Sequence, residues 1–293
     1  MPEGHTLRRL ALDLTAAFGG RGVRVSSPQG RFAADAASLD GAECVGADSA
    51  GKHLFLEFAG ERFVHVHLGL IGTFDVHCDV AEVPPPVGQV RLRVSTVDGD
   101  HASYADLRGA IQCDLVTRAR VEEVVAGLGP DPLRPDADPA RAWRRISRSS
   151  RSIGDLLMDQ SVVAGVGNVY RAEVLFRHRI DPRRPGRSLR SGQFRAIWDD
   201  LVELMADGVR TGRIDTVRPQ HTPEAMGRPP RVDDHGGEVY VYRRTGRACH
   251  VCGSVVRTEV LAGRNLFWCP RCQPTFRSRA VKSSSPAPPG PRT

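Results

Sequence analysis

The chain has 293 residues, enough for two domains with separate cores, and carries a formal net charge of +7 with a pI of about 9.3. It has no apolar leader and no apolar run of membrane-spanning length, so we expect neither a secreted nor a membrane protein.

The charge is unevenly distributed. Residues 1–125 hold 12 basic and 17 acidic side chains, whereas residues 139–213 hold 15 arginines and eight acidic residues. A basic second half beside an acidic first half indicates an oriented surface for a polyanion such as nucleic acid. A solvated arginine-rich face is the alternative.

The first predicted element is an amphipathic helix that ends at Gly19-Gly20. Its apolar face consists of Leu7, Leu10, Ala11, Leu14 and Phe18. Before the helix stand Pro2 and Glu3. A small second residue allows removal of Met1, which would leave Pro2 as a secondary amine, partly neutral and nucleophilic near pH 7, beside a carboxylate. Taken alone, this pair is more often an ordinary chain start.

Short strands follow the helix. The alternation from His53 to Phe58, the turn at Gly60-Glu61 and the return from Phe63 to Leu68 predict a β-hairpin. A second hairpin is expected between Val90 and Asp106, with Asp98-Gly99-Asp100 at its turn. Several short strands after one helix predict a β-sandwich or barrel.

Lys52 stands just before the first hairpin strand. It is the only lysine ahead of the C-terminal tail, in a chain with 39 arginines. This indicates a position that needs a compact ammonium group able to change protonation, with chance as the alternative.

The second half of the chain has helical periodicity. Asp138-Pro139 predicts a helix start, and Ser152 to Asp155 resembles a capping box. The turn Gly165-Val166-Gly167 leads into Asn168, which we expect to cap the next helix. A glycine turn at a helix N-terminus binds phosphate, although a plain corner between helices is the alternative. A later helix has an apolar face of Phe194, Trp198, Leu201 and Met205.

Two C-x-x-C pairs are the strongest chemical signal. Cys249 and Cys252 are separated by 16 residues from Cys269 and Cys272, a spacing that suits one structural, tetrahedral Zn²⁺. The residues between the pairs predict a β-hairpin that the metal would hold, with a turn at residues 262–265.

Arg264 lies in this turn, where an exposed arginine is suited to contact a phosphate. The other cysteines, Cys44, Cys78 and Cys113, show no disulfide pattern. Together with the missing leader, this favours a reducing cytoplasm.

Together, the motifs resemble the formamidopyrimidine-DNA glycosylase / endonuclease VIII family across residues 2–274. In chain order they are Pro2-Glu3, Gly51-Lys52-His53-Leu54, His67-Leu68-Gly69, Leu128-Gly129-Pro130-Asp131-Pro132-Leu133, Asp159-Gln160, Gly165 to Arg171, and the cysteine hairpin with Gly263-Arg264. The Pro2-Glu3-Gly4 opening and the segment from Gly236 to Tyr242 are closer to the endonuclease VIII branch.

The resemblance implies an α+β multidomain chain. Its parts would be an N-terminal β-sandwich with a leading helix, a linker, a helix-two-turns-helix domain, a zinc-binding β-hairpin and a disordered tail. The expected limits are 1–123, 124–138, 139–239, 240–276 and 277–293, respectively. DNA would lie in the cleft between the two main domains.

The implied activity is that of a bifunctional DNA glycosylase and AP lyase of base excision repair. It would act as a monomer, in the cytoplasm at the nucleoid, on double-stranded DNA with a damaged base or an abasic site, with oxidised pyrimidines favoured. Pro2 would attack C1′ and form an iminium that permits β- and δ-elimination, and Glu3 would serve as general acid/base at the sugar ring oxygen. Lys52 would approach the lesion. We expect Glu3→Gln to impair base removal while leaving folding intact.

The resemblance also implies a set of DNA contacts. Asn168 and Arg264, helped by His67, would hold the phosphates that flank the flipped-out nucleotide. Leu70 would fill the vacated space, unless it is a buried loop leucine.

One departure concerns Arg108. The residues that follow it are Gly109-Ala110, in place of the intercalating Arg-x-Phe pair of the formamidopyrimidine branch. Two other functions remain open at this point. One is a non-catalytic protein that binds damaged DNA on the same scaffold. The other is a zinc-ribbon transcription or RNA-binding factor, which leaves the N-terminal domain unexplained.

Overall fold

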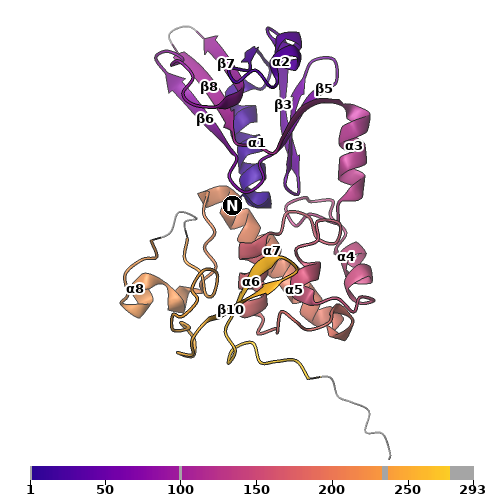
Figure 1. Cartoon of the computed structure of the whole chain (residues 1–293), viewed down its shortest axis with the longest axis vertical. Coiled ribbons are helices and arrows are strands. Elements are labelled where there is room, and N and C mark those ends of the chain that lie inside the picture. The colour runs from indigo at the N-terminus through magenta and orange to yellow at the C-terminus, as the bar shows by residue number, and fades with distance from the viewer. Residues whose placement is uncertain (1, 99–100, 233–236, 278–293) are drawn as a thin grey trace, which may run out of the picture.

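The computed structural model describes residues 2–98, 101–232 and 237–277, which form two domains joined end to end (Figure 1). Met1, the turn residues Gly99-Asp100, Gly236 and residues 278–293 of the expected tail lie outside the described residues. Among the residues described, no helix has the length and apolarity that a membrane span needs.

The N-terminal domain is a β-sandwich with a leading helix, as predicted. Its two antiparallel sheets have the strand orders β1-β3-β4-β5-β9 and β2-β7-β8-β6. The elements are α1 (Gly4–Phe18), β1 (Arg21–Gly22), β2 (Arg24–Ser26), α2 (Ala33–Leu39), β3 (Glu43–Ala50), β4 (His53–Phe58), β5 (Arg62–His67), β6 (Thr73–Val80), β7 (Val90–Asp98), β8 (His101–Arg108) and β9 (Gln112–Thr117). Helix α2 was not predicted.

The five-stranded sheet buries side chains on both faces. Leu54, Leu56 and Phe58 of β4 pack with the apolar face of α1 in the core of the sandwich. Phe55 points to the opposite face, where it packs against Leu128 and Ala164 from the second half of the chain. The five-stranded sheet, which contains the β4–β5 hairpin, is therefore fixed to the other domain.

The connection between the domains includes a helix. Helix α3 (Arg118–Gly127) extends four residues into the segment expected as a linker. Because Gly127 lacks a side chain and Pro130 cannot donate a hydrogen bond, the helical pattern stops here. The domain limits given above remain predictions.

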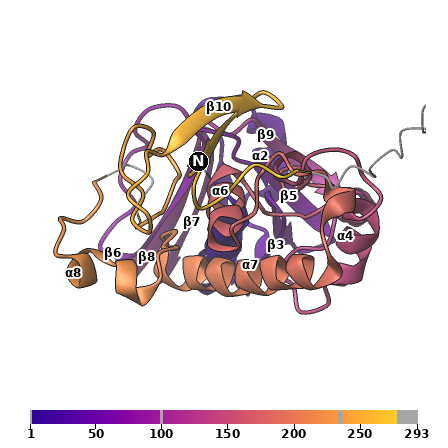
Figure 2. The same cartoon turned by 90° about the horizontal axis from the view of Figure 1, so that it is seen from below.

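The second domain is helical and carries the cysteine hairpin (Figures 1 and 2). Its elements are α4 (Pro139–Ile146), α5 (Ile153–Leu156), α6 (Asn168–Arg177), the 3₁₀ turn η1 (Gly186–Ser188), α7 (Ser191–Thr211), the 3₁₀ turn η2 (Pro219–His221), α8 (Pro223–Met226), β10 (Arg257–Leu261) and β11 (Arg264–Trp268). Asp138 and Ser152 cap α4 and α5 as predicted. The short elements η2 and α8 were not predicted.

Helix α6 is the centre of this domain. Figure 2 shows it between α7 on one side and the β10–β11 hairpin on the other, and it contacts both. Cys249, Cys269 and Phe267 share one buried cluster with the residues of α6 and α7. The zinc hairpin is therefore part of the helical domain's core and not a separate appendage.

Candidate active site

Glu3 is completely buried where the two domains meet. Its Oε2 accepts a hydrogen bond from the backbone N–H of Gly167 at 2.8 Å, and its Oε1 accepts one from Val169 at 2.8 Å. Burial raises the pKa of Glu3, although the Lys52 ammonium and these N–H groups act in the opposite direction. The carboxylate thus occupies the positive end of α6.

The expectation that Asn168 caps this helix was wrong. Gly167 holds the cap position, Asn168 is the first helical residue, and the Glu3 carboxylate accepts the hydrogen bonds of the helix start. A buried carboxylate fulfils the role because the first N–H groups of a helix have no partner within it.

At the predicted glycine turn, the backbone of residues 165–167 lies in close contact with the start of α1. Gly4 donates its N–H to the carbonyl of Gly165 at 2.8 Å, and a Cβ atom on Gly4 would lie 2.8 Å from Cα of Gly165. A Cβ atom on Gly167 would lie 2.3 Å from Cδ of Glu3. Glycine is therefore required so that the helix N-terminus can receive the carboxylate.

We expect Gly167→Ala to displace the Glu3 carboxylate, destabilise the fold by about 1–3 kcal/mol and slow the base removal that the resemblance implies by about 10²-fold, the effect of a misplacement of about 1 Å. Gly192→Ala in α7 is the matched control, because a Cβ atom there meets nothing within 4 Å. Chemical denaturation and single-turnover kinetics of both variants provide the measurement. Equal behaviour of the two variants would contradict the assigned contact.

Lys52 lies at the tip of the β3–β4 hairpin and is half-buried. Gly51, with φ of +57°, donates its N–H to Oδ2 of the buried Asp131 at 2.8 Å, which holds the tip against the second domain. Burial lowers the pKa of Lys52; the nearby Glu3 carboxylate raises it and Arg264 lowers it further. Lys52 therefore releases its proton at a lower pH than an exposed lysine.

Pro2 borders a pocket of about 440 Å³ between the domains. The start of α1 forms one wall with His5, Thr6 and Arg9, and Leu68 and residues 70–76 form the other. The volume is in the range of pockets that enclose small ligands, about 300–1,000 Å³. Pro2 therefore lies at the edge of a cavity that a small group can enter.

The loop after β5 presents apolar side chains. Leu70 is 54 % exposed and lines the pocket, so the alternative of a buried loop leucine was wrong. Ile71 and Ile111, which the sequence analysis missed, are 82 % and 68 % exposed. The N–H of Ile111 donates a hydrogen bond to the carbonyl of His67 at 3.1 Å, which joins the loop between β8 and β9 to the end of β5. Isoleucines inside glycine-flanked loops were the available sequence signal.

Arg108 is engaged on the sandwich. Its guanidinium pairs with Asp106 at 2.7 Å and Asp75 at 3.2 Å, and it donates to the carbonyl of Val87. A contact from Arg108 to an unpaired base would require these pairs to break.

Asn168 and Arg264 come from α6 and β11. Nδ2 of Asn168 and Nη2 of the buried Arg171 both donate to the carbonyl of Asn265 at 2.9 Å, and Arg171 also bonds Oδ1 of Asn168. Arg171, quoted in a motif but given no role, thus ties the helix to the hairpin. Burial lowers its pKa to about 10, which leaves it charged at neutral pH.

Arg264 begins β11 instead of lying in the turn. The turn consists of Ala262-Gly263, both with positive φ, and Leu261 pairs with Arg264 across the hairpin. Arg264 is exposed, and it lies close enough to Lys52 to affect the pKa of that lysine. The structure therefore gathers Glu3, Lys52 and Arg264 at the junction of the domains.

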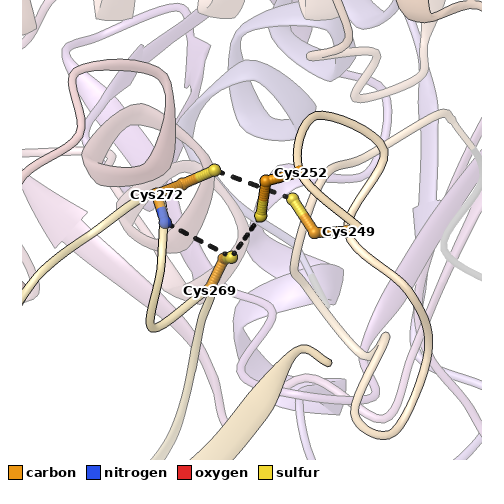
Figure 3. Close-up of side chains that lie close together, drawn as sticks. All are labelled: Cys249, Cys252, Cys269 and Cys272. Atoms are coloured by element: carbon orange, nitrogen blue, oxygen red, sulfur yellow. Dashed lines mark hydrogen bonds between the residues drawn. The ribbon is translucent and has the colours of Figure 1, made fainter. Parts of the chain in front are cut away.

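The four cysteines converge on one point (Figure 3). All four Sγ atoms lie within 4.8 Å of one another, with 3.4 Å between Cys252 and Cys269 and 3.9 Å between Cys249 and Cys272. Tetrahedral Zn²⁺ with Zn–S bonds of about 2.3 Å places sulfurs about 3.8 Å apart. The donor set and its geometry fit one structural zinc ion.

Three family models match the chain. Residues 1–113 match the formamidopyrimidine-DNA glycosylase N-terminal domain, residues 128–219 the formamidopyrimidine-DNA glycosylase H2TH domain, and residues 246–275 a zinc finger found in FPG and IleRS. Endonuclease 8 1 of Mycobacterium tuberculosis is 53 % identical over 275 residues, which cover 93 % of this chain and 100 % of that protein. The chain belongs to the formamidopyrimidine-DNA glycosylase family.

Other members are similar over the same length. Formamidopyrimidine-DNA glycosylase of Geobacillus kaustophilus is 32 % identical, covering 93 % of this chain and 98 % of that protein. The crystal structure of the MutM (Fpg) protein of Thermus thermophilus matches with 29 % identity and a TM-score of 0.70, covering 93 % and 98 % of the two chains. The Lactococcus lactis Fpg complex with abasic-site DNA has 22 % identity, a TM-score of 0.74 and coverage of 93 % and 100 %, a likeness of fold. The family and fold class inferred from the sequence are confirmed.

Proposed function

We propose that Pro2, Glu3 and Lys52 carry out the DNA glycosylase and AP-lyase reactions of this family, on double-stranded DNA with a damaged base or an abasic site. The observation that carries the proposal is the buried Glu3 carboxylate, held at the start of α6 near Lys52, one residue from the Pro2 that borders the pocket. A protein that only binds DNA needs no carboxylate with a raised pKa beside an amine with a lowered one.

The reaction begins once Met1 has been removed and Pro2 ends in a secondary amine. Its nitrogen attacks C1′ of the damaged nucleoside, the N–C1′ bond forms, and the glycosidic bond breaks as the base leaves with the proton that the Pro2 nitrogen releases. Glu3, whose pKa is raised by burial, transfers a proton to the ring oxygen as the sugar opens. The product is an iminium between Pro2 and C1′.

Strand cleavage follows from the iminium. It acidifies the C2′ proton, so loss of that proton breaks the C3′–O bond and releases a 5′-phosphate end. A second elimination breaks the C5′–O bond and leaves a gap with phosphates on both sides. The Lys52 ammonium stabilises negative charge on the leaving phosphate.

The DNA contacts come from both domains. Arg264, which is exposed, and Asn168 hold the phosphates that flank the flipped nucleotide, and His67 assists from the end of β5. Leu70 and Ile71 enter the space that the nucleotide vacates. These contacts read backbone shape, so the lesion is selected mainly by how easily it leaves the stack.

The substrates that we infer are oxidised pyrimidines before oxidised purines, which is supported by the 53 % identity to a protein named endonuclease 8. We also propose that the protein acts at the nucleoid in the cytoplasm. Seven cysteines, none in a disulfide, support a reducing compartment.

We expect duplexes with thymine glycol or dihydrouracil to be cut faster than a duplex with 8-oxoguanine, and an abasic site to be cut fastest because it needs no base removal. Gel analysis of end-labelled strands should show phosphate on both sides of the gap. Tight binding to every duplex without cleavage would favour a non-catalytic damage-binding protein instead.

A further inference from the structure

Three histidines, His53, His65 and His67, form a cluster next to Lys52. Only His67 has a role in the chemistry described above. His53 begins β4 directly after Lys52, His65 and His67 are on β5, and Gln112 begins β9. The ring centroids of His53 and His65 are 5.1 Å apart, and those of His53 and His67 are 5.0 Å apart, edge to face. His65 is 2 % exposed. Buried polar rings at this density require a defined hydrogen-bond pattern.

A continuous chain of hydrogen bonds joins three of these residues. Nε2 of Gln112 lies 3.1 Å from Nδ1 of His65, and Nε2 of His65 lies 2.9 Å from Nδ1 of His53. The Gln112 amide NH₂ group can only donate, so Nδ1 of His65 accepts and its proton is on Nε2. That proton is donated to Nδ1 of His53, which therefore carries its own proton on Nε2.

His67 reaches the same tautomer by a different route. The backbone N–H of Gly69 donates to Nδ1 of His67 at 3.1 Å, so the proton of His67 is also on Nε2. In the part of the chain that the structure describes, neither Nε2 of His53 nor Nε2 of His67 has a partner, and neither is among the buried polar atoms that lack one. Two N–H donors are thus open to solvent beside Lys52.

We propose that Gln112 and His65 form a relay that fixes His53 as a neutral Nε2–H donor, and that His53 acts with His67 as a two-donor contact to the DNA phosphate beside Lys52. The proposal rests on the proposed function, which brings a phosphate to Lys52. A phosphate is bound by hydrogen-bond donors. The relay provides one such donor, Nε2–H of His53, and because the ring is neutral it adds no second positive charge next to the Lys52 ammonium.

The surroundings keep the rings uncharged. Burial lowers the pKa of His53 and of His65 to about 4, and burial and the Lys52 ammonium lower that of His67. The other charged groups that face His65 are Asp114 on β9, which favours its protonated form, and Arg120 on α3, which disfavours it. At neutral pH the contact therefore depends on the tautomer and not on a positive charge.

Gln112→Glu tests the relay, because it keeps the shape and removes the donor. A carboxylate can only accept, so His65 must place its proton on Nδ1, His53 must do the same, and Nε2 of His53 then presents a lone pair to the phosphate.

At pH 8, where imidazoles are neutral, we expect binding to a duplex with a tetrahydrofuran abasic analogue to weaken about tenfold or more, the effect of losing one hydrogen bond to a charged group. Long-range ¹H–¹⁵N imidazole spectra should show the His53 proton on Nε2 in the wild type and on Nδ1 in the variant.

Gln112→Glu also adds a negative charge, and a double-mutant cycle with His65→Phe separates this effect from that of the relay. The phenylalanine interrupts the relay and keeps a flat ring against Phe55. If the relay carries the effect, Gln112→Glu changes binding less than twofold in the His65→Phe background. An equal loss in both backgrounds, or a His53 proton on Nδ1 in the wild type, would overturn the proposal. Because the analogue is bound without turnover, failure of the proposed catalysis leaves this readout unaffected, and failure of the relay leaves the cleavage products unchanged.

Discussion

Glu3→Gln should slow the removal of an oxidised pyrimidine by about 10²- to 10⁴-fold, the range for loss of a positioned acid, while cleavage of a preformed abasic site is affected much less. The difference arises because base removal needs proton donation to the ring oxygen, whereas an abasic sugar already exists partly as the open aldehyde that Pro2 attacks. Single-turnover assays on the two duplexes measure both rates. Glu122→Gln on the exposed face of α3 is the control.

The structure changes the expectation for the stability of this variant. The carboxylate accepts hydrogen bonds at both oxygens, so a glutamine would direct its NH₂ group at a backbone N–H of Gly167 or Val169. One unsatisfied buried group costs about 1–3 kcal/mol, which chemical denaturation can resolve. Equal loss of both catalytic steps, in proportion to the unfolded fraction, would show that Glu3 is structural and would contradict its role as an acid.

Loss of the zinc ion should have the second large effect. Structural zinc contributes about 10–16 kcal/mol in small zinc peptides, about as much as the whole stability of a typical domain. Since Cys249 and Cys269 share the core of α6 and α7, we expect Cys269→Ser to lose the metal, the order of β10–β11 and the packing of the nearby helices. Affinity for abasic-site DNA should fall with them, because β11 positions Arg264.

Three measurements follow the consequences of Cys269→Ser: zinc content, hydrogen-exchange protection of β10–β11, and the Kd for an abasic-site duplex. Cys78→Ser is the matched control, since Cys78 is exposed on β6. Metal loss with an unchanged Kd would mean that Arg264 does not depend on the zinc site for its position.

Features with a short sequence period or fixed spacing could be predicted. The apolar face of α1, the first hairpin and the four cysteines are each determined by residues close together in the chain. The pairing of Glu3 with Gly167 could not be predicted from pattern, because the two residues are 164 positions apart and the N–H donors belong to the backbone. For the same reason Asn168 was given a cap role that its side chain does not fill.

Contacts between segments that are far apart in the chain could not be predicted from the sequence either. The side chain of Ile111 packs against Gly69, where a Cβ atom would lie 2.7 Å from the isoleucine, and no local pattern in the sequence encodes this contact. The relay from Gln112 to His53 depends on strand register across three strands, which no local period encodes.

Both reactions depend on a bond between the nitrogen of Pro2 and C1′ of the lesion. Borohydride reduction during reaction with an abasic-site duplex, followed by proteolysis and mass spectrometry of the cross-linked peptide, tests it most directly. We predict an N-terminal peptide that lacks Met1 and carries the reduced sugar on Pro2. An adduct on Lys52, or cleavage of the duplex with no trapped complex, would show that Pro2 is not the nucleophile.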